Sequence, residues 1–373
     1  MVLHGRDAAH KVLNKMAESG QYKMPDKFPC VEIFAKDKKE AAEAILTQSS
    51  SYGKFTEEGL YGFIHEYDLV SDFAEIKDGL ELPDFDLDGF ESGWVDDKPG
   101  GDGNEDDVPE VPGVAKSKLG DLFQLGEHRL LCGNSTKRED VAWLMDGKKA
   151  ILMNTDPPYG IDFVGLSQSK GQSKNHKKIA NDNLTDGKAL QKFLEDSIRT
   201  VLPYLEKGTA FYLWHPMLTQ GTFFAAAAAA DIIVNRQIVW VKPSFVFGRG
   251  DYHWKHELCF YGWVKGNQPP FYGERNQHTI WEIGRENDGI HPTQKPVELF
   301  TRPIRNHTKA GEICYEPFAG SGSQFIACEK TGRICYGLEL EPLYCDVCVS
   351  RYCKFIGNNK IIKNGEEIEW PIN

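Results

Sequence analysis

The sequence predicts an α/β protein in which a doubly wound, mainly parallel sheet is joined to a small α/β N-terminal domain. After residue 114, six apolar runs end in polar or glycine-rich turns, and amphipathic helical patterns separate them. A long acidic stretch rich in glycine and proline precedes this part. Strands that are buried on both faces and alternate with helices form parallel sheets with helices on both sides.

Charge is distributed unevenly along the 373 residues. Residues 1–113 hold 11 Lys+Arg and 26 Asp+Glu, a net charge of −15, whereas the remainder holds 32 and 29, a net charge of +3. Strong negative charge opposes binding to a duplex, because phosphates repel it. Any nucleic-acid contact is therefore expected after residue 113.

Three segments follow from composition. Residues 1–80 form the small α/β domain, and residues 81–113 form an acidic linker that cannot bury enough apolar area to fold tightly. Residues 114–373 form the main domain. The elements predicted in the first segment are helices at 6–20, 37–51 and 56–67 and a strand at 28–35.

Strands and helices alternate in the main domain. Residues 185–205 carry apolar side chains at helical spacing after a capping Thr185 or Asp186, and the alanine run at 223–231 favours a helix. Ligands of such folds bind at the carboxyl ends of the strands. The predicted strands are 128–134, 150–156, 209–215, 231–241, 312–318 and 333–340.

The cysteines and the hydropathy predict a reduced, cytoplasmic protein without membrane contact. Nine cysteines, an odd number, fit free thiols better than disulfides. Cys345, Cys348 and Cys353 fall within one expected helix and lack a fourth ligand, so we expect buried thiols and no metal. No run of about 18 apolar residues and no signal-peptide pattern is present.

The strand predicted at 150–156 runs directly into Asp156, Pro157, Pro158 and Tyr159. Asp156 and the carbonyl of Pro157 can accept hydrogen bonds from the exocyclic amine of a base, which favours a tetrahedral nitrogen with its lone pair directed at an electrophile. The prolines stiffen the turn, and Tyr159 supplies a stacking face. The alternative is an ordinary proline turn with a buried tyrosine.

A strand, a glycine loop, a helix and a second strand follow one another in residues 312–342. Gly320 and Gly322 let the backbone approach a bulky ligand, and Glu339 is spaced to accept hydrogen bonds from ribose hydroxyls. This pattern is typical of a site for a nucleoside cofactor. The alternative is a glycine turn that only packs the helix on the strand.

The order of "DPPY", "HPTQKP" at 291–296 and "FAGSG" resembles that of the β-class DNA amino-methyltransferases, which have a circularly permuted class I S-adenosylmethionine-dependent methyltransferase fold. The resemblance spans about residues 117–354 and includes "GRGDYHWKHELCFYGW". It implies that S-adenosylmethionine methylates adenine N6 within a short sequence of double-stranded DNA. Asp156, Pro157, Pro158 and Tyr159 are then the catalytic residues.

Other interpretations stay open. Cytosine N4 presents the same chemistry, although that subgroup more often has serine in place of Asp156. A related fold methylates glutamine amides and usually has asparagine there. A catalytically degenerate DNA-binding regulator is the alternative outside enzymes.

The resemblance also implies cofactor contacts. In the family, S-adenosylmethionine lies over the loop that matches residues 318–322, its ribose bonds the acid that matches Glu339, and the motif at 291–296 helps to hold its methionine end. Asn134 stands where the family usually has aspartate; an amide can still accept a hydrogen bond but adds donors. The implied residues are Asn134, Thr293, Lys295, Phe318, Gly320, Ser321, Gly322 and Glu339.

DNA contacts are predicted in insertions around 165–183 and 241–290. The first is a basic glycine/serine loop suited to phosphates, or else a solvated charged loop. The second interleaves basic and aromatic residues where the family carries target recognition, although His256 and Glu257 could equally be a structural pair. The predicted DNA-binding residues are Lys170, Lys174, His176, Lys177, Lys178, Arg249, Tyr252, Trp254 and Lys255.

The N-terminal segment more faintly resembles the later half of a ParB-like domain. Such modules are joined to methyltransferases of this kind in phage and prophage proteins, and restriction-modification is the implied setting. A homodimer is compatible with the resemblance.

Overall fold

The computed structural model describes most of the main domain and part of the N-terminal segment. The described residues are 35–50, 60, 63–64, 67, 69, 73–80, 104–161, 184–246, 251–273, 277–284 and 295–371.

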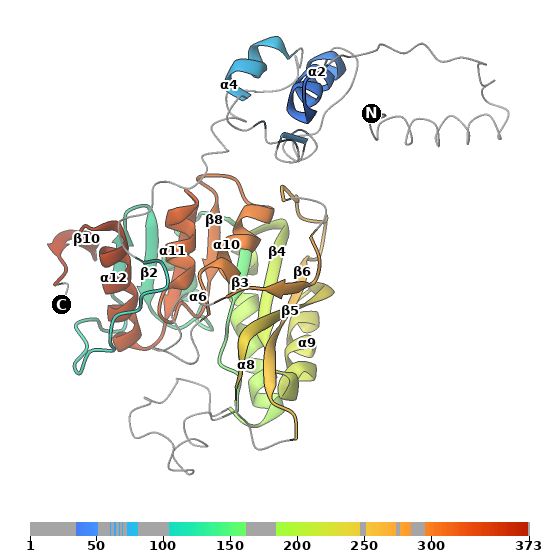
Figure 1. The fold of residues 1–373 in the computed structure, drawn as a ribbon. Coiled ribbons are helices and arrows are strands. Elements are labelled where there is room, and N and C mark those ends of the chain that lie inside the picture. The colour runs from blue at the N-terminus through green and yellow to red at the C-terminus, as the bar shows by residue number, and fades with distance from the viewer. Residues whose placement is uncertain are drawn as a thin grey trace.

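The N-terminal segment forms short helices (Figure 1) and a small apolar core. Its elements are α2 (Lys38–Ser50), which confirms the second predicted helix, α4 (Phe73–Ile76) and the short helix η2 (Lys77–Gly79). The apolar side chains that pack together here are Ala42, Leu46, Leu60, Ile64, Leu69, Phe73 and Leu80. Three predicted elements lie wholly or mostly outside the described residues: 6–20, 28–35 and 56–67.

The main domain is built on one eleven-stranded sheet of order β11-β10-β1-β2-β9-β8-β3-β4-β6-β5-β7 (Figure 1). The strands, in that order, are Glu366–Glu369, Lys360–Lys363, Leu122–Leu125, His128–Cys132, Ile334–Glu339, Ile313–Glu316, Ala150–Thr155, Leu205–His215, Trp254–Val264, Ile232–Val246 and Ile280–Glu282.

The five central strands, β2, β9, β8, β3 and β4, are parallel to one another. In the centre, Leu152 of β3 lies opposite Cys314 of β8. All six predicted strands are present, as β2, β3, β4, β5, β8 and β9. Antiparallel pairs flank this centre on both sides, so the predicted insertion at 241–290 contributes the end of β5, β6 and β7 to the sheet.

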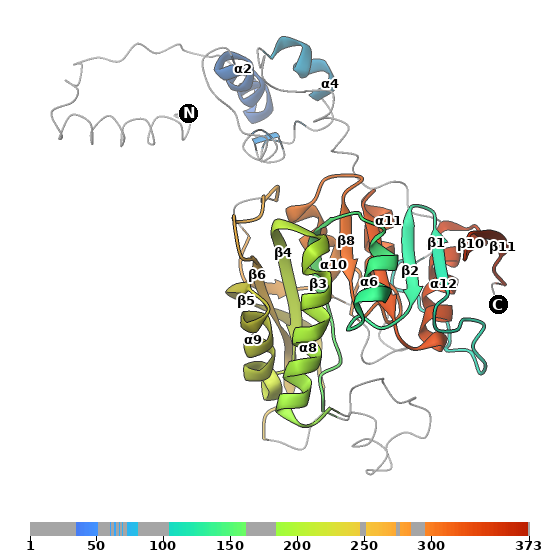
Figure 2. The ribbon, with the colours of Figure 1, turned by 180° about the vertical axis from the view of Figure 1, so that it is seen from behind.

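Helices cover both faces of the sheet, which confirms the predicted doubly wound architecture. On one face lie α10 (Glu298–His307), α11 (Ser323–Lys330) and α12 (Pro342–Ile356), seen in front in Figure 1. On the other lie α6 (Arg138–Met145), α8 (Gly187–Val201) and α9 (Gln220–Ala229), seen in front in Figure 2. The short helices η3 and η4 span Leu202–Tyr204 and Met217–Thr219.

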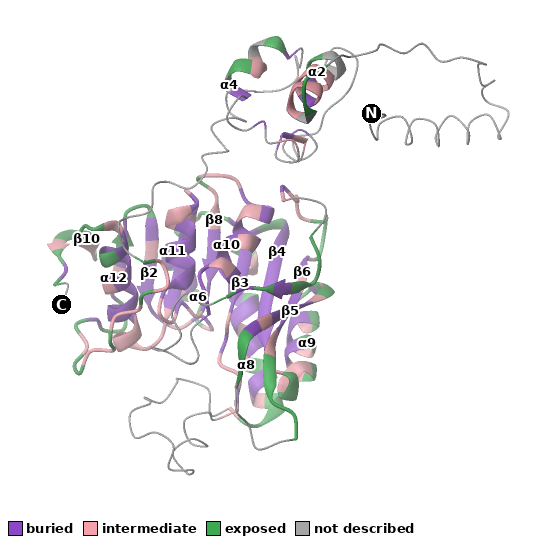
Figure 3. Cartoon of the chain, viewed as in Figure 1, coloured by how far each residue is buried: buried purple, intermediate pink, exposed green. Residues whose placement is uncertain are grey.

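Local chemistry accounts for the helix positions. The Asp186 carboxylate accepts hydrogen bonds from the backbone N–H groups of Lys188 and Ala189, so it caps α8 as predicted. The alanine run forms α9, where Ala226 and Ala227 are small enough to be fully buried against the sheet. Figure 3 shows the same division, with buried central strands and exposed outer helix faces.

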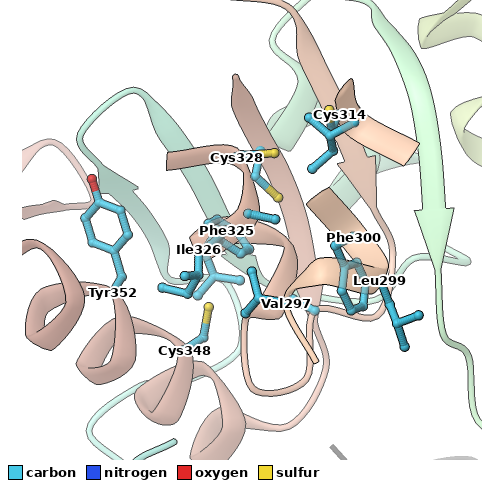
Figure 4. Close-up of a cluster of buried hydrophobic side chains, with 14 of the residues drawn as sticks. Val297, Leu299, Phe300, Cys314, Phe325, Ile326, Cys328, Cys348 and Tyr352 are labelled. Carbon is cyan, nitrogen blue, oxygen red and sulfur yellow. The ribbon is translucent and has the colours of Figure 1, made fainter. Parts of the chain in front are cut away.

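The core beneath α10, α11 and α12 holds the glycine loop in place (Figure 4). Val297, Phe325 and Cys348 belong to this cluster. Gly322 has φ +84°, and a Cβ there would lie 2.6 Å from Cys348 Sγ. The loop therefore requires glycine at 322 for its backbone angle and for its close packing on α12.

Cys345, Cys348 and Cys353 are free, buried thiols on α12, as expected. In the described part of the chain, no cluster of three or more His, Cys, Asp or Glu residues is suited to a metal ion. Within the same part, every helix is too short or too polar to cross a membrane.

Candidate active site

The predicted catalytic and cofactor motifs meet at one edge of the sheet. Asp156 follows the last residue of β3, Phe318 follows β8 after one residue, and Glu339 ends β9. These strands are parallel and adjacent in the order β9-β8-β3. Their carboxyl ends therefore share an edge, the usual place of ligands in open α/β sheets.

The turn after β3 presents the Asp156 carboxylate, whose Oδ1 accepts a hydrogen bond from within the turn. The Tyr159 hydroxyl donates a 2.9 Å hydrogen bond to Asp156 Oδ1. The Asp156 side chain remains 29% exposed, so a ligand can reach it. Burial, reinforced by the charges of Asp156 and Glu257, raises the pKa of Tyr159 well above its ordinary value, which keeps the phenol neutral.

Lys295 joins this turn from the segment before α10. Its Nζ lies 2.6 Å from Asp156 Oδ2 and 3.0 Å from the Tyr159 hydroxyl. Burial alone would lower the pKa of Lys295, but the carboxylates of Asp156 and Glu257 outweigh burial and raise it. Lys295 is therefore charged. It contacts the Asp156–Tyr159 turn, which we call the base motif, whereas the sequence led us to expect that Lys295 contacts the cofactor.

Two residues of the antiparallel strands complete the charged group. Glu257 on β6 lies 3.1 Å from Lys295 Nζ, and Lys242 on β5 lies 2.5 Å from the other Glu257 oxygen. Burial alone would raise the pKa of Glu257, but Lys295 and Lys242 lower it to about 2. The sequence suggested a structural pair of Glu257 with His256, whereas Glu257 contacts these two lysines.

The aromatic ring of Trp214 packs against the Lys295 ammonium. The Lys295 ammonium lies 5.2 Å from the Trp214 ring centroid, within cation–π range. The indole Nε1 donates a 3.2 Å hydrogen bond to Asn154 Oδ1, which fixes the orientation of the buried ring. Next to Trp214, His215 stacks on Phe260, and burial lowers the pKa of His215 to about 4, so its imidazole is neutral.

Glu316 ties the ends of β3 and β8 together. Its Oε1 accepts hydrogen bonds from Thr155 Oγ1 at 2.8 Å and from the Phe318 backbone N–H at 3.0 Å. Burial raises the pKa of Glu316 well above its ordinary value. Glu316 thereby links the base motif to the glycine loop.

Gly320 and Glu339 are brought together, as the spacing predicts. The Gly320 backbone N–H donates a 2.8 Å hydrogen bond to Glu339 Oε2, and the Glu341 N–H donates one to Oε1. Burial raises the pKa of the Glu339 carboxyl. Each carboxylate oxygen keeps a second lone pair, so two hydroxyls of a ligand could still donate to Glu339.

Arg351, on α12, donates hydrogen bonds to the same glycine loop. Its Nη1 donates to the Ser321 carbonyl at 3.2 Å and to Ser323 Oγ at 3.0 Å, and its Nη2 donates to the Glu105 carbonyl at 2.8 Å. Asp106 accepts a 2.9 Å hydrogen bond from the Val297 N–H at the start of α10. The end of the predicted acidic linker therefore contacts Arg351, which bonds the glycine loop, and Val297, which follows the motif at 291–296.

Asn134 lies beside Glu339, because the Gly133 N–H donates to the Glu339 carbonyl. Its Oδ1 accepts hydrogen bonds from the N–H of Thr136 at 2.9 Å and from the Thr136 hydroxyl at 2.8 Å. An amide oxygen has two lone pairs, and both are used here. The group that Asn134 can offer a ligand is therefore its NH₂ donor.

The predicted DNA-binding residues are only partly described. Tyr252 is 91% exposed near the tip of the β5–β6 hairpin, where Trp254 and Lys255 are also exposed and Phe245 stacks on His253. The predicted site residues outside the described part are Lys170, Lys174, His176, Lys177, Lys178, Arg249 and Thr293.

Sequence reasoning missed several members of the site. Hydrophobic patterning marked Trp214 only as part of a strand, and no local spacing connects Lys242 or Glu257 with Lys295. Glu316 lies inside a recognised motif, but the upward shift of its pKa depends on burial.

Known proteins resemble this chain over the region of these motifs. The N6/N4 methyltransferase family model, described as DNA methylase, matches residues 151–350. Type II methyltransferase M2.MboI of Moraxella bovis is 33% identical over 220 residues, 54% of this chain and 80% of that protein. Type II methyltransferase M.Cfr9I of Citrobacter freundii is 33% identical over 99 residues, 26% of this chain and only 33% of that protein.

A solved structure is similar to this chain over part of its length. The M1.HpyAVI–SAM complex has a TM-score of 0.45 and 20% sequence identity, and its match covers 60% of this chain and 98% of that chain.

Proposed function

Since the chain belongs to the N6/N4 DNA methylase family, we propose that it transfers a methyl group from S-adenosylmethionine to the N6 amine of a flipped adenine in double-stranded DNA. One arrangement carries the proposal. The Asp156–Tyr159 turn and the Gly320–Glu339 pair occupy neighbouring strand ends of one sheet. One sheet thus holds Asp156, the proposed acceptor for the target base, and Glu339, the proposed acceptor for the nucleoside of the cofactor.

The residues at the glycine loop fit the proposed cofactor. The backbone at Gly320 and Gly322 has positive φ angles that favour glycine, and no Cβ stands between the loop and a ligand there. Glu339 offers free lone pairs to two ribose hydroxyls, and Asn134 lies beside Glu339. When bound, S-adenosylmethionine supplies an electrophilic methyl group on a sulfonium.

Asp156 addresses the weakness of the nucleophile. The lone pair of an exocyclic amine is delocalised into the ring, and hydrogen bonds from the amine to Asp156 and to the Pro157 carbonyl favour a tetrahedral nitrogen. The bound cofactor would supply the methyl group to this nitrogen and leave as the neutral thioether, and the amine proton that is released would pass to solvent. The Asp156 carboxylate stabilises the positive nitrogen electrostatically.

Access to the amine requires base flipping, because the reacting nitrogen cannot be reached inside a duplex. Tyr159 is proposed as the stacking platform, which offsets about 1–3 kcal/mol of the stacking energy that each flipped base gives up. The exposed aromatic side chains of the β5–β6 hairpin support a DNA contact on this side. Cytosine N4 is the competing target. The aspartate at position 156 favours adenine, because the cytosine-N4 subgroup more often has serine at this position.

The test combines activity with product identity. Transfer of a labelled methyl group from S-adenosylmethionine into unmethylated DNA, followed by nucleoside digestion and mass spectrometry, should yield N6-methyldeoxyadenosine. N4-methyldeoxycytidine would correct the base but keep the mechanism. No incorporation into any DNA would reject the enzymatic proposal in favour of a DNA-binding regulator.

Variants test the mechanism separately. Asp156→Ala should abolish methyl transfer, and cofactor affinity should fall less than activity. The thermal midpoint should also fall, because the buried Lys295 ammonium loses one of its two carboxylates. Tyr159→Ala should weaken the hold on the flipped base, and Tyr159→Phe should be milder because the ring remains. Full activity of Asp156→Ala would disprove the role given to the carboxylate.

A further inference from the structure

Four charged side chains of alternating sign form a continuous row behind the base motif. Lys242 contacts Glu257, Glu257 contacts Lys295, and Lys295 contacts Asp156, with nitrogen–oxygen distances of 2.5, 3.1 and 2.6 Å. They come from β5, β6, the segment before α10 and the turn after β3. The row therefore connects the antiparallel edge of the sheet to the proposed reacting centre.

Burial of this row of charges costs free energy, because the charged groups lose their hydration. The Lys295 side chain is only 4% exposed, and an isolated ammonium in such a place would lose its proton or move towards water. Two carboxylates and two ammonium groups compensate one another, and aromatic rings add cation–π contacts at Lys295 and Lys242. Asp156 is the most exposed member, so the row ends at a ligand-accessible oxygen.

A purely structural role explains this arrangement poorly. Buried ion pairs often contribute little net stability, because desolvation offsets the attraction, and apolar residues of similar volume can replace them. A group at an active site, by contrast, gains from being held within a fraction of an ångström of the productive geometry. The orientation of Asp156 depends on Lys295, and the position of Lys295 depends on its second carboxylate.

Resting on the proposed function, we propose that Glu257 is a positioning residue for methyl transfer, which with Lys242 holds the Lys295 ammonium against Asp156. Glu257 touches neither the target base nor the cofactor in this scheme. It fixes the cation that orients the acceptor carboxylate. Removal of its charge would leave Lys295 with one carboxylate and would leave Lys242 uncompensated.

The proposal has a signature in the pH dependence. Among the described residues, the titratable groups that face Lys295 are Asp156 and Tyr159 from the β3 turn and Glu257 and Cys259 from β6. At present the carboxylates outweigh burial and raise the pKa of Lys295. Without the Glu257 charge, the opposing effect of burial gains weight, so the pKa of Lys295 should fall and a loss of activity at alkaline pH should begin at lower pH.

The experiment compares wild type with Glu257→Gln in the full-length chain. The variant should lower kcat roughly tenfold, a size expected for small misplacement of a reacting group, with the KM for S-adenosylmethionine nearly unchanged. Its alkaline limb of kcat should move to lower pH, and Glu257→Asp should recover part of the rate. Glu369→Gln, at an exposed glutamate on the far end of the sheet, is the matched control.

A second variant keeps the test decisive if Glu257→Gln does not fold. Lys242→Met removes the partner of Glu257 without touching Lys295, and it should lower kcat by a smaller factor. Because a neighbouring positive charge is lost, the pKa of Lys295 should rise and the alkaline limb should move to higher pH, opposite to its shift in Glu257→Gln. An active, folded variant with wild-type kcat and pH profile would overturn the positioning role. An inactive wild type would instead reject the proposed function, so the two failures are distinguishable.

Discussion

The backbone N–H of Gly320 and the carboxylate of Glu339 are joined by a 2.8 Å hydrogen bond between the ends of β8 and β9. One side chain thus shapes the glycine loop and also faces the expected ribose position. Glu339→Gln should weaken S-adenosylmethionine binding by about 10- to 100-fold, the range for hydrogen bonds to a charged acceptor. Calorimetry measures the affinity, and Glu367→Gln on exposed β11 is the control. Unchanged affinity would remove Glu339 from the cofactor site.

Asn134 offers a test in which binding should improve. Both lone pairs of its Oδ1 are taken by Thr136. Asn134→Asp keeps those contacts and adds a second oxygen that can accept from the adenine amine of the cofactor, so binding should tighten by about tenfold. Weaker binding in the same titration would mean that the Asn134 NH₂ group donates to the cofactor.

The acidic segment at 104–107 should support cofactor binding through Arg351 and α10. A chain that begins at residue 104 should bind S-adenosylmethionine like the full-length protein, whereas one that begins at residue 112 should bind less tightly. Removal of the Asp106 hydrogen bond at the start of α10 alone should cost about 1 kcal/mol, or about 2–4 °C in thermal midpoint. Asp106→Ala should show this decrease and the exposed Glu110→Ala should not; equal behaviour of the two truncations would show that the segment is only a tether.

His307 should make the main domain sensitive to mild acid. Its Nδ1 donates to the Pro270 carbonyl, its Nε2 accepts from the Tyr212 hydroxyl, and burial lowers the pKa of the ring to about 4. The unfolded chain binds this proton near pH 6.5 and the folded chain does not, so stability should fall as pH decreases from 6.5 towards 4, by on the order of 2–3 kcal/mol. Urea unfolding across this range measures the slope.

The matching variants separate His307 from other groups. His307→Gln should lower stability at pH 7 but flatten its dependence on pH, because the titrating ring is gone. His278→Gln, at an exposed position, should leave the slope unchanged. An equally steep slope in His307→Gln would assign the acid sensitivity elsewhere.

The basic loop remains a prediction of the sequence. Neutralising Lys174, Lys177 and Lys178 together should weaken DNA binding regardless of sequence. It should also make the salt dependence shallower, by about 0.9 in log–log slope for each phosphate that the loop no longer neutralises. Filter binding or fluorescence anisotropy over a salt series measures the slope. An unaltered slope would favour a solvated surface loop.

Local patterns in the sequence determined much of the fold and of the candidate site. Apolar runs located six strands, the cap at Asp186 located α8, and the spacing of Gly320 and Glu339 anticipated their contact. These features depend on neighbouring residues or on one strand–helix–strand unit, whose geometry is nearly fixed.

The tertiary structure decided which distant segments meet at those strand ends. The β5–β6 pair brings Lys242 and Glu257 to Lys295. The acidic segment at 104–107 contacts Arg351, which lies far from it in sequence. It also decided the pKa shifts, because the raised pKa of Glu316 and the lowered pKa of Glu257 depend on burial and on partners far away in sequence. Residue types and spacing thus determined the chemistry available, whereas strand order and desolvation determined which groups face one another and in which ionic form.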